Sequence, residues 1–213
     1  MTFTVEGDAA HDEVWIFGFG SLIWRAGFEY QKRVEGYIKG YRRVFYQGST
    51  DHRGTPEAPG RVVTLEEAPG SQCWGAAYLI AGTYDEQQNT LAYLEWREKQ
   101  YDLRVRVDVF GRESLEVPVV RGALTYIASA DRVKNLNYAG PAPREAIAQQ
   151  IASAIGPSGP NDEYLYGLVR ALQEMGVHEE ELMWLAGRVK HLKGSSEEDN
   201  RTTVQLEAGS VIG

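Results

Sequence analysis

An apolar stretch at residues 14–24, VWIFGFGSLIW, is the feature that most constrains how this chain can fold. Its opening residues are β-branched or aromatic, which is typical of a buried strand. Gly18 and Gly20 then interrupt the run, because glycine accepts a positive φ and lets the backbone turn tightly or approach a ligand closely. Successive N–H groups in such a turn can bind an anion. We therefore expect either the floor of a binding site or an ordinary buried strand end.

The spacing of these residues excludes two familiar glycine motifs. A dinucleotide-binding fingerprint needs a third glycine three residues after Gly20, where Ile23 stands. A nucleophile elbow needs glycine at spacing two on both sides of its serine, and Leu22 and Ile23 follow Ser21 instead. Ser21 is therefore not expected to be a nucleophile.

The balance of charge argues against a nucleic-acid partner. The 213 residues carry a formal net charge of −8, whereas nucleic acids are bound through a basic face that neutralises phosphates. A chain of this length can bury one good core. The composition therefore favours a compact protein that acts on a small molecule.

Cysteine and histidine are too sparse for disulfide or zinc chemistry. Cys73 is the only cysteine, so no intramolecular disulfide can form. The histidines include no pair at ligand spacing, and we therefore expect no metal site. They are His11, His52, His178 and His191.

The two ends of the chain differ from its middle. Residues 1–13 are polar and lack the apolar segment of a secretory signal, and no run is long enough to span a bilayer. These features predict a flexible leader on a cytoplasmic protein that does not enter membranes. Residues 193–213 are rich in Ser, Glu, Asp, Asn and Gly and predict a flexible tail. A single domain at residues 14–192 lies between them.

The hydrophobic pattern predicts an α+β fold. Strands are expected at 14–17, 35–46, 61–65, 74–80, 104–109 and 122–127. About six short strands with few helices between them favour an antiparallel sheet that closes into a small barrel. After residue 142 three apolar stripes at helical spacing predict a helical C-terminal region.

One helix, at about residues 85–99, interrupts the strands and carries a candidate base. At 100° per residue, Glu98 lies within the apolar stripe that Leu91 and Leu94 define. Burial there raises the pKa of a carboxyl toward the range that a general base needs at neutral pH. An exposed helix end, with Glu98 solvated or paired to an arginine, is the alternative.

A long loop at residues 49–60 is dense in turn-forming and charged residues. Asp51, His52, Arg53 and Glu57 can hold one another by hydrogen bonds. We expect His52 to fix this loop rather than to act as a catalytic base.

Four stretches taken together resemble the ChaC-like family of glutathione-specific γ-glutamylcyclotransferases. The resemblance covers about residues 14–192 and is closest to the plant cytosolic branch, through residues 51–65 and 73–78. Any one stretch is common, but the ordered set is specific. The stretches are FGFGSLIW at 17–24, DHRGTP at 51–56, YLEWREK at 93–99 and NYAGPAP at 137–143.

The resemblance implies a fold, an activity and a set of site residues. The fold is a γ-glutamylcyclotransferase-like small mixed β-barrel with flanking helices. The activity is that of a lyase that cleaves glutathione to 5-oxoproline and Cys-Gly without a cofactor. By position, Glu98 matches the catalytic glutamate of the family. The substrate-binding residues implied are Phe19, Gly20, Ser21, Leu22, Arg61 and Tyr138.

One residue departs from the family pattern. The family loop usually has tyrosine where this chain has Phe19, so the ring is kept and its hydroxyl is absent. This change predicts altered activity rather than its loss. Two alternative functions remain: a cyclotransferase for other γ-glutamyl amino acids or amines, and a barrel that binds a γ-glutamyl ligand without turnover.

Overall fold

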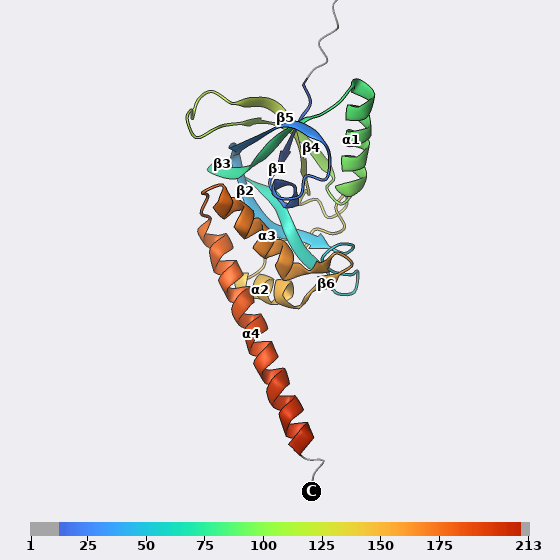
Figure 1. Cartoon of the computed structure of the whole chain (residues 1–213), viewed down its shortest axis with the longest axis vertical. Coiled ribbons are helices and arrows are strands. Elements are labelled where there is room, and N and C mark those ends of the chain that lie inside the picture. Colours follow the sequence, from blue (N-terminus) through green and yellow to red (C-terminus); the bar gives the residue numbers. More distant parts are fainter. Residues whose placement is uncertain (1–12, 210–213) are drawn as a thin grey trace, which may run out of the picture.

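The computed structural model describes residues 13–209, which combine a curved sheet with helices (Figure 1). The main sheet contains β1 (Trp15–Gly18), β2 (Tyr30–Ser49), β3 (Gly60–Ile80), β4 (Leu103–Val109) and β5 (Val120–Ile127). A small hairpin contains β6 (Ile155–Gly156) and β7 (Gly159–Pro160). The helices are the 3-10 turn η1 (Ser21–Ile23), α1 (Tyr84–Arg97), α2 (Arg144–Ser153), α3 (Asn161–Glu174) and α4 (Glu180–Gly209). The α+β class predicted from the pattern is confirmed.

Strands β2 and β3 form one long antiparallel hairpin that dominates the sheet. The pattern predicts separate strands at 61–65 and 74–80, but both segments lie within β3. The pairing of β2 with β3 contains three register shifts, and such irregularities bend a strand without ending it. The prediction of separate short strands is wrong here, because each irregularity interrupts the alternation of side chains and leaves the ladder in place.

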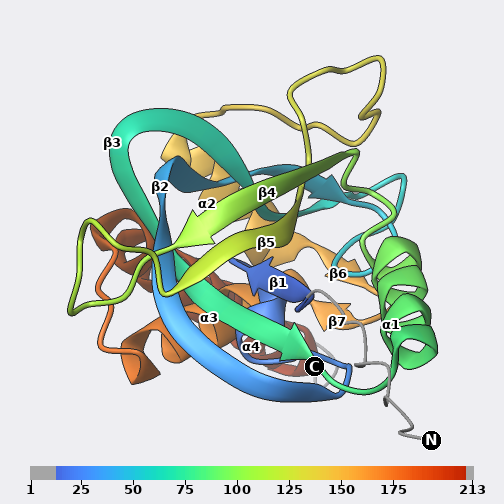
Figure 2. The same ribbon diagram turned by 90° about the horizontal axis from the view of Figure 1, so that it is seen from above.

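The sheet curls until its two edge strands meet. The strand order is β2-β3-β1-β5-β4, with β1 antiparallel to β3 and parallel to β5. Purely antiparallel pairing is therefore wrong at β1, since the long connection to β5 allows parallel pairing. At the edges, Tyr37 and Phe110 exchange backbone hydrogen bonds of 2.9 and 2.8 Å. Figure 2 shows the curl. One isolated bridge does not make a continuous ladder, so the closed barrel stays a prediction.

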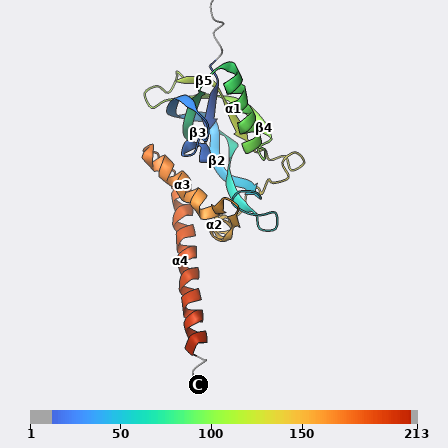
Figure 3. The ribbon, with the colours of Figure 1, turned by 45° about the vertical axis from the view of Figure 1, so that its right-hand side comes forward.

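Two apolar clusters hold the helices against the sheet. The larger cluster packs helices α2, α3 and α4 against β1, β2 and β3, and includes Phe17, Leu165 and Val189. The smaller cluster packs α1 through Leu94, which is fully buried, against Ile16. Figure 3 shows α1 on one side of the sheet and α4 extending beyond it. Helix α1 and the C-terminal helices therefore pack through different clusters, and the candidate site lies between α1 and α3.

The structure tests the predictions for the two ends of the chain only in part. The predicted leader lies outside the described residues except for Glu13. Helix α4 continues to Gly209 and so includes most of the predicted tail, whose flexibility stays a prediction. Among the helices described, none is both long enough and apolar enough to cross a membrane.

Candidate active site

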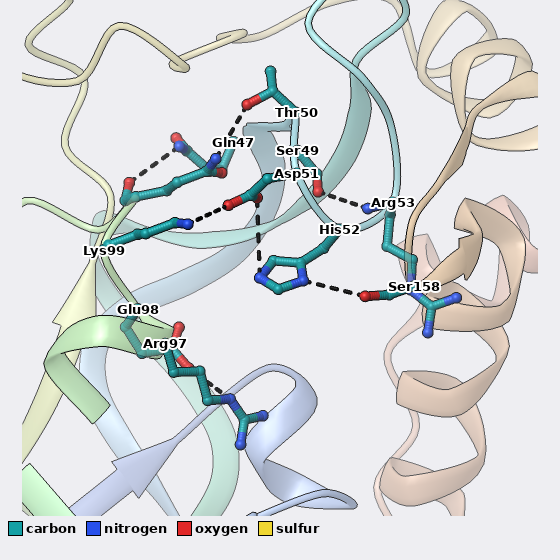
Figure 4. Close-up of polar contacts among 11 residues, drawn as sticks. Gln47, Ser49, Thr50, Asp51, His52, Arg53, Arg97, Glu98, Lys99 and Ser158 are labelled. Atoms are coloured by element: carbon teal, nitrogen blue, oxygen red, sulfur yellow. Dashed lines mark hydrogen bonds and ion pairs between the residues drawn. The ribbon is translucent and has the colours of Figure 1, made fainter. Parts of the chain in front are cut away.

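A cavity of about 310 Å³ lies between the glycine turn, the end of α1, the loop that joins β2 to β3, and α3 (Figure 4). The structure brings five of the predicted site residues to its walls. They are Phe19, Gly20, Ser21, Leu22 and Glu98. The cavity is therefore lined by segments that are far apart in the sequence.

The glycine turn owes its shape to close packing. Gly20 has φ −121°, and neither Gly18 nor Gly20 has a positive φ, so the turn does not use the left-handed conformation that glycine permits. A Cβ at Gly18 would collide with the Leu22 side chain. A Cβ at Gly20 would lie 2.9 Å from Tyr164 Oη and 3.1 Å from Val63 Cγ2. The glycines are needed because the backbone lies directly against its neighbours.

Two backbone amides of this turn, which lines the cavity, have no acceptor among the described residues. The first amide of η1 that donates to a backbone carbonyl is that of Ile23, 3.0 Å from Gly20 O. Within residues 13–209 the amides of Ser21 and Leu22 have no acceptor, as expected at the start of a helical turn. Phe19, only 5% exposed, packs into the core beside them. The turn therefore offers N–H donors next to an aromatic ring.

Glu98 ends helix α1 at the cavity. The helix stops at Arg97, and Glu98 is its C-cap with φ −94° and an N–H that donates to Leu94 O at 2.8 Å. The prediction that the helix continues to residue 99 is wrong, but the carboxyl is still buried, with 14% of the side chain exposed. Burial raises the pKa of Glu98, and the nearby Arg97 cation opposes this rise. Glu98 therefore has the environment expected of a general base.

Arg97 connects Glu98 to the glycine turn. Its guanidinium donates to Ala26 O at 2.6 Å, to Arg25 O at 2.9 Å and to Ser21 Oγ at 3.1 Å. Its Nε also lies 3.3 Å from Glu98 Oε1. One side chain thus fixes the end of η1 and partly balances the buried carboxylate.

Tyrosines surround Glu98 with rings that stay neutral at neutral pH. Tyr101 donates to Val63 O at 2.7 Å, and the Tyr164 hydroxyl accepts from Val63 N at 3.4 Å. Burial raises the pKa of Tyr101, Tyr164 and Tyr126, and the negative charge of Glu98 raises each further. Within the described residues, none of these phenols donates a hydrogen bond to the Glu98 carboxyl.

The loop between β2 and β3 forms the opposite wall. His52 Nδ1 lies 3.2 Å from Ser158 Oγ, and His52 Nε2 lies 3.9 Å from Asp51 Oδ1. Asp51 instead pairs with Lys99 at 3.0 Å. A catalytic triad needs its histidine hydrogen-bonded to both partners, and 3.9 Å is too long. The contacts agree with the prediction that His52 fixes the loop.

Known proteins resemble this chain over most of its length. A family model described as ChaC-like protein matches residues 14–192. The chain belongs to the ChaC-like family. Gamma-glutamylcyclotransferase 2-3 of Arabidopsis thaliana is 51% identical over 198 residues, which cover 93% of this chain and 99% of that protein.

More distant ChaC-like relatives also align over most of the chain. Glutathione-specific gamma-glutamylcyclotransferase 1 of Homo sapiens is 41% identical over 172 residues, covering 79% of this chain and 74% of that protein. The crystal structure of a γ-glutamyl cyclotransferase specific to glutathione from yeast superposes with a TM-score of 0.72 at 29% identity. It covers 85% of this chain and 100% of that chain.

Two predicted site residues of this ChaC-like chain lie away from the cavity walls. Arg61 is buried, and its guanidinium donates to Gln150 Oε1 at 2.6 Å, Phe45 O at 2.7 Å and Gly140 O at 2.8 Å. Tyr138 forms an isolated bridge with Gln47. Their substrate-binding role stays a prediction, and their visible contacts hold the segment 137–143 against β2.

Sequence reasoning did not select Arg97, Tyr101 and Tyr164 for this site. Arg97 falls outside the apolar stripe of its helix. It directly precedes Glu98, however, so the sequence does indicate that it lies near the carboxyl. Tyr164 lies on α3 and carries no local signal. Only the packing of α3 against the glycine turn brings it to the cavity.

The side chains of the ChaC-like cavity suit proton transfer. Ser21 Oγ accepts from Arg97, and no histidine contacts it in the described part of the chain. Cys73 is buried away from the cavity, and burial raises the pKa of its thiol. Among residues 13–209, no three His, Cys, Asp or Glu side chains gather as metal ligands would. Glu98 remains as the group placed to exchange a proton.

Proposed function

We propose that this ChaC-like chain is a γ-glutamylcyclotransferase that cleaves glutathione to 5-oxoproline and Cys-Gly. The observation that carries the proposal is the buried Glu98 carboxyl, which faces a cavity of about 310 Å³ beside the unpaired amides of the glycine turn. The human relative is named glutathione-specific gamma-glutamylcyclotransferase 1, which supports the choice of substrate.

The reaction takes its nucleophile from the substrate. The α-amine of the γ-glutamyl group attacks the γ-carbonyl, a new C–N bond closes a five-membered ring, and the bond to the cysteinyl nitrogen breaks. From its ammonium form the attacking nitrogen loses two protons as it becomes the ring amide. The cysteinyl nitrogen takes one of them to leave as an amine, and the other goes to that amine or to solvent. A well-oriented intramolecular reaction is favoured by about 7–11 kcal/mol over free encounter. The covalent tether within the substrate supplies part of this advantage, and the site supplies the orientation by holding the γ-glutamyl chain folded. The protein therefore needs to fold the substrate and to move protons away from the attacking nitrogen and onto the leaving one.

Glu98 is proposed to carry out this proton transfer. The substrate ammonium is mostly charged at neutral pH, so a base must accept its proton before attack and then deliver it to the leaving nitrogen. A carboxyl of raised pKa suits both steps, because it holds the proton longer than an exposed carboxyl does. The Arg97 cation keeps the ionised form accessible.

The glycine turn is proposed to bind the γ-glutamyl end of the substrate. Its amides at Ser21 and Leu22 can hold either the α-carboxylate or the oxyanion that develops on the γ-carbonyl. Gly20 lets the backbone lie against Tyr164, so the turn is held rigidly. Phe19 gives this end an aromatic wall without the usual hydroxyl.

Replacing Glu98 with glutamine tests the proposal, because glutamine keeps the shape of the side chain and cannot transfer the proton. We expect release of 5-oxoproline from glutathione to fall by at least roughly a hundredfold, with an unchanged circular dichroism spectrum. Glu95→Gln is the matched control, since Glu95 on the same helix pairs with Arg104 and is 38% exposed. Near-normal turnover by Glu98→Gln would show that Glu98 is not the base.

A broader substrate range is the second candidate. The name of the Arabidopsis relative at 51% identity does not specify glutathione. A panel of γ-glutamyl compounds, followed by mass detection of 5-oxoproline, separates the two. We expect glutathione to react and γ-glutamylalanine to remain intact. Equal turnover of both would favour the broader activity, and binding without turnover would favour a non-catalytic γ-glutamyl-binding protein.

We further propose that residues 14–192 act as a single domain built on a small β-barrel, in the cytoplasm. The bridge between Tyr37 and Phe110 supports the barrel, because it joins the two edge strands. The family match over the same residues supports the domain limits.

A further inference from the structure

The loop that joins β2 to β3 builds a second polar end of the cavity, opposite Glu98. His52 and Arg53 come from this loop, and Ser158 comes from the β6–β7 turn. All three line the cavity together with Glu98. Figure 4 shows His52 between Asp51 and Ser158, with Glu98 and Arg97 lying below the ring.

This end of the cavity is held rigidly by backbone contacts. Ser158 N donates to His52 O at 2.9 Å, and Arg53 N donates to Ser49 Oγ at 3.0 Å. A Cβ at Gly156 would collide with His52 O, so the hairpin and the loop lie directly against each other. Groups held in this way bind a ligand with little loss of conformational freedom.

Arg53 presents unused donors at this end. Its NH1 group makes both of its side-chain contacts, to Pro160 O at 2.8 Å and to Glu163 Oε2 at 2.8 Å. Within the described residues, Nε and the other terminal nitrogen of Arg53 have no partner. The side chain is only 15% exposed and lines the cavity. A part-buried guanidinium with free N–H groups is a strong site for a carboxylate.

The positions of the charges assign this donor to one end of the substrate. Of the arginines that line the cavity, Arg97 is occupied by the turn and Glu98, and Arg25 lies on the turn side and is exposed. Tyr164, from α3, lines the same cavity as Glu98 and Arg53. Figure 4 shows Glu98 and Arg53 on opposite sides of the His52 ring.

We propose that Arg53 binds the C-terminal glycine carboxylate of glutathione, and so selects substrates that carry a carboxylate at this position. The inference rests on the proposed function, in which the γ-glutamyl group occupies the end beside Glu98. The departing Cys-Gly then extends toward the loop, where His52 and Ser158 hold Arg53's neighbouring backbone. Arg53 acts on substrate choice, and Glu98 acts on the chemistry.

The test compares glutathione with its C-terminal amide, because the two differ only in the charged group. We expect wild-type kcat/KM to be at least about tenfold higher for glutathione. Arg53→Met should lose this preference, because its kcat/KM should fall for glutathione and stay unchanged for the amide. Arg53→Lys should show a preference between those of the wild type and Arg53→Met, since lysine keeps the charge without the paired N–H groups. Arg25→Met is the matched control and should keep the preference.

A binding arm separates failure of this inference from failure of the proposed function. Affinity of Glu98→Gln protein for both compounds is measured by calorimetry, with and without Arg53→Met, after thermal melting has shown that each variant is folded. Preference for the carboxylate that disappears with Arg53→Met supports the site even if no 5-oxoproline is released. The inference is overturned if Arg53→Met keeps the preference, weakens both compounds equally, or if Arg25→Met removes the preference instead.

Discussion

Replacing Arg97 with methionine removes the contacts that connect the glycine turn to Glu98. The guanidinium donates to Ala26 O at 2.6 Å, Arg25 O at 2.9 Å and Ser21 Oγ at 3.1 Å, and it lies 3.3 Å from Glu98 Oε1. Methionine keeps much of the aliphatic stem and none of these polar contacts. Both stability and catalysis should therefore respond.

The loss of stability follows from the hydrogen bonds. A bond from a charged donor contributes about 1.5–3 kcal/mol, but the carbonyls of Arg25 and Ala26 lie near solvent and can accept water instead. The free energy of unfolding should therefore fall by about 2–4 kcal/mol, well below the sum of the separate bonds. For a chain of this size the corresponding fall in Tm is about 5–15 °C.

The effect on catalysis has a defined sign. The Arg97 cation opposes the rise that burial causes in the pKa of Glu98. Without Arg97 this pKa rises further, so the acid limb of kcat/KM moves to higher pH. The turn at Ser21 also loses its anchor, and a misplacement of the substrate should lower kcat by about 10–100-fold even above that limb.

The assay follows 5-oxoproline release across the pH range, with kcat and KM separated and Tm measured on the same protein. Arg104→Met is the control, since Arg104 pairs with Glu95 on the exposed face of the same helix. It should leave the acid limb where the wild type has it. An acid limb at the wild-type pH in Arg97→Met would refute the reasoning, and an unchanged Tm would show that the contacts to the turn contribute little.

Two further predictions concern the turn and the base. Glu98→Gln should become more stable relative to the wild type as pH rises. The raised pKa of Glu98 means that the native wild type binds this proton more tightly than the unfolded chain does. Wild-type stability is therefore lost as pH increases through that pKa. Thermal melting of both proteins at about pH 4 and about pH 8 checks this. A Tm of Glu98→Gln that falls relative to the wild type between these two pH values contradicts it. Gly20→Ala should lower stability by about 1–3 kcal/mol and weaken substrate binding, because its Cβ would lie 2.9 Å from Tyr164 Oη. Gly187→Ala in α4 is the control, since its Cβ meets nothing within 4 Å; a stability loss equal to that of Gly20→Ala would contradict the packing argument.

Local pattern indicated a buried position for Glu98 but did not exclude the alternative, a helix end at which Glu98 pairs with an arginine; the structure shows both the burial and the pairing with Arg97. The spacing of Leu91, Leu94 and Glu98 places the carboxyl over the sheet, and Leu94 is fully buried as expected. The stripe did not show that α1 ends at Arg97, because the residues near 97–99 carry no strong stop signal. The carboxyl remains largely buried beyond the helix end, in a cavity that Tyr101 and Tyr164 also line.

Long-range packing explains what the pattern missed. The glycines at 18 and 20 predict a special turn, but their reason, the close approach of Leu22 and Tyr164, depends on residues that the local sequence does not place. Arg53 is similar. Its place in a charged loop suggested local hydrogen bonds, whereas its partners Pro160 and Glu163 belong to the C-terminal half of the chain.

The end of α1 explains how one carboxyl can serve as a base. A helix C-terminus carries partial negative charge, which disfavours a carboxylate there, and burial disfavours it further. Arg97 opposes both effects from the adjacent position, and the same guanidinium anchors the turn that faces the substrate. A change in the turn therefore alters the charge balance at Glu98 through this one side chain, which is why the pH profile of Arg97→Met tests catalysis and architecture together.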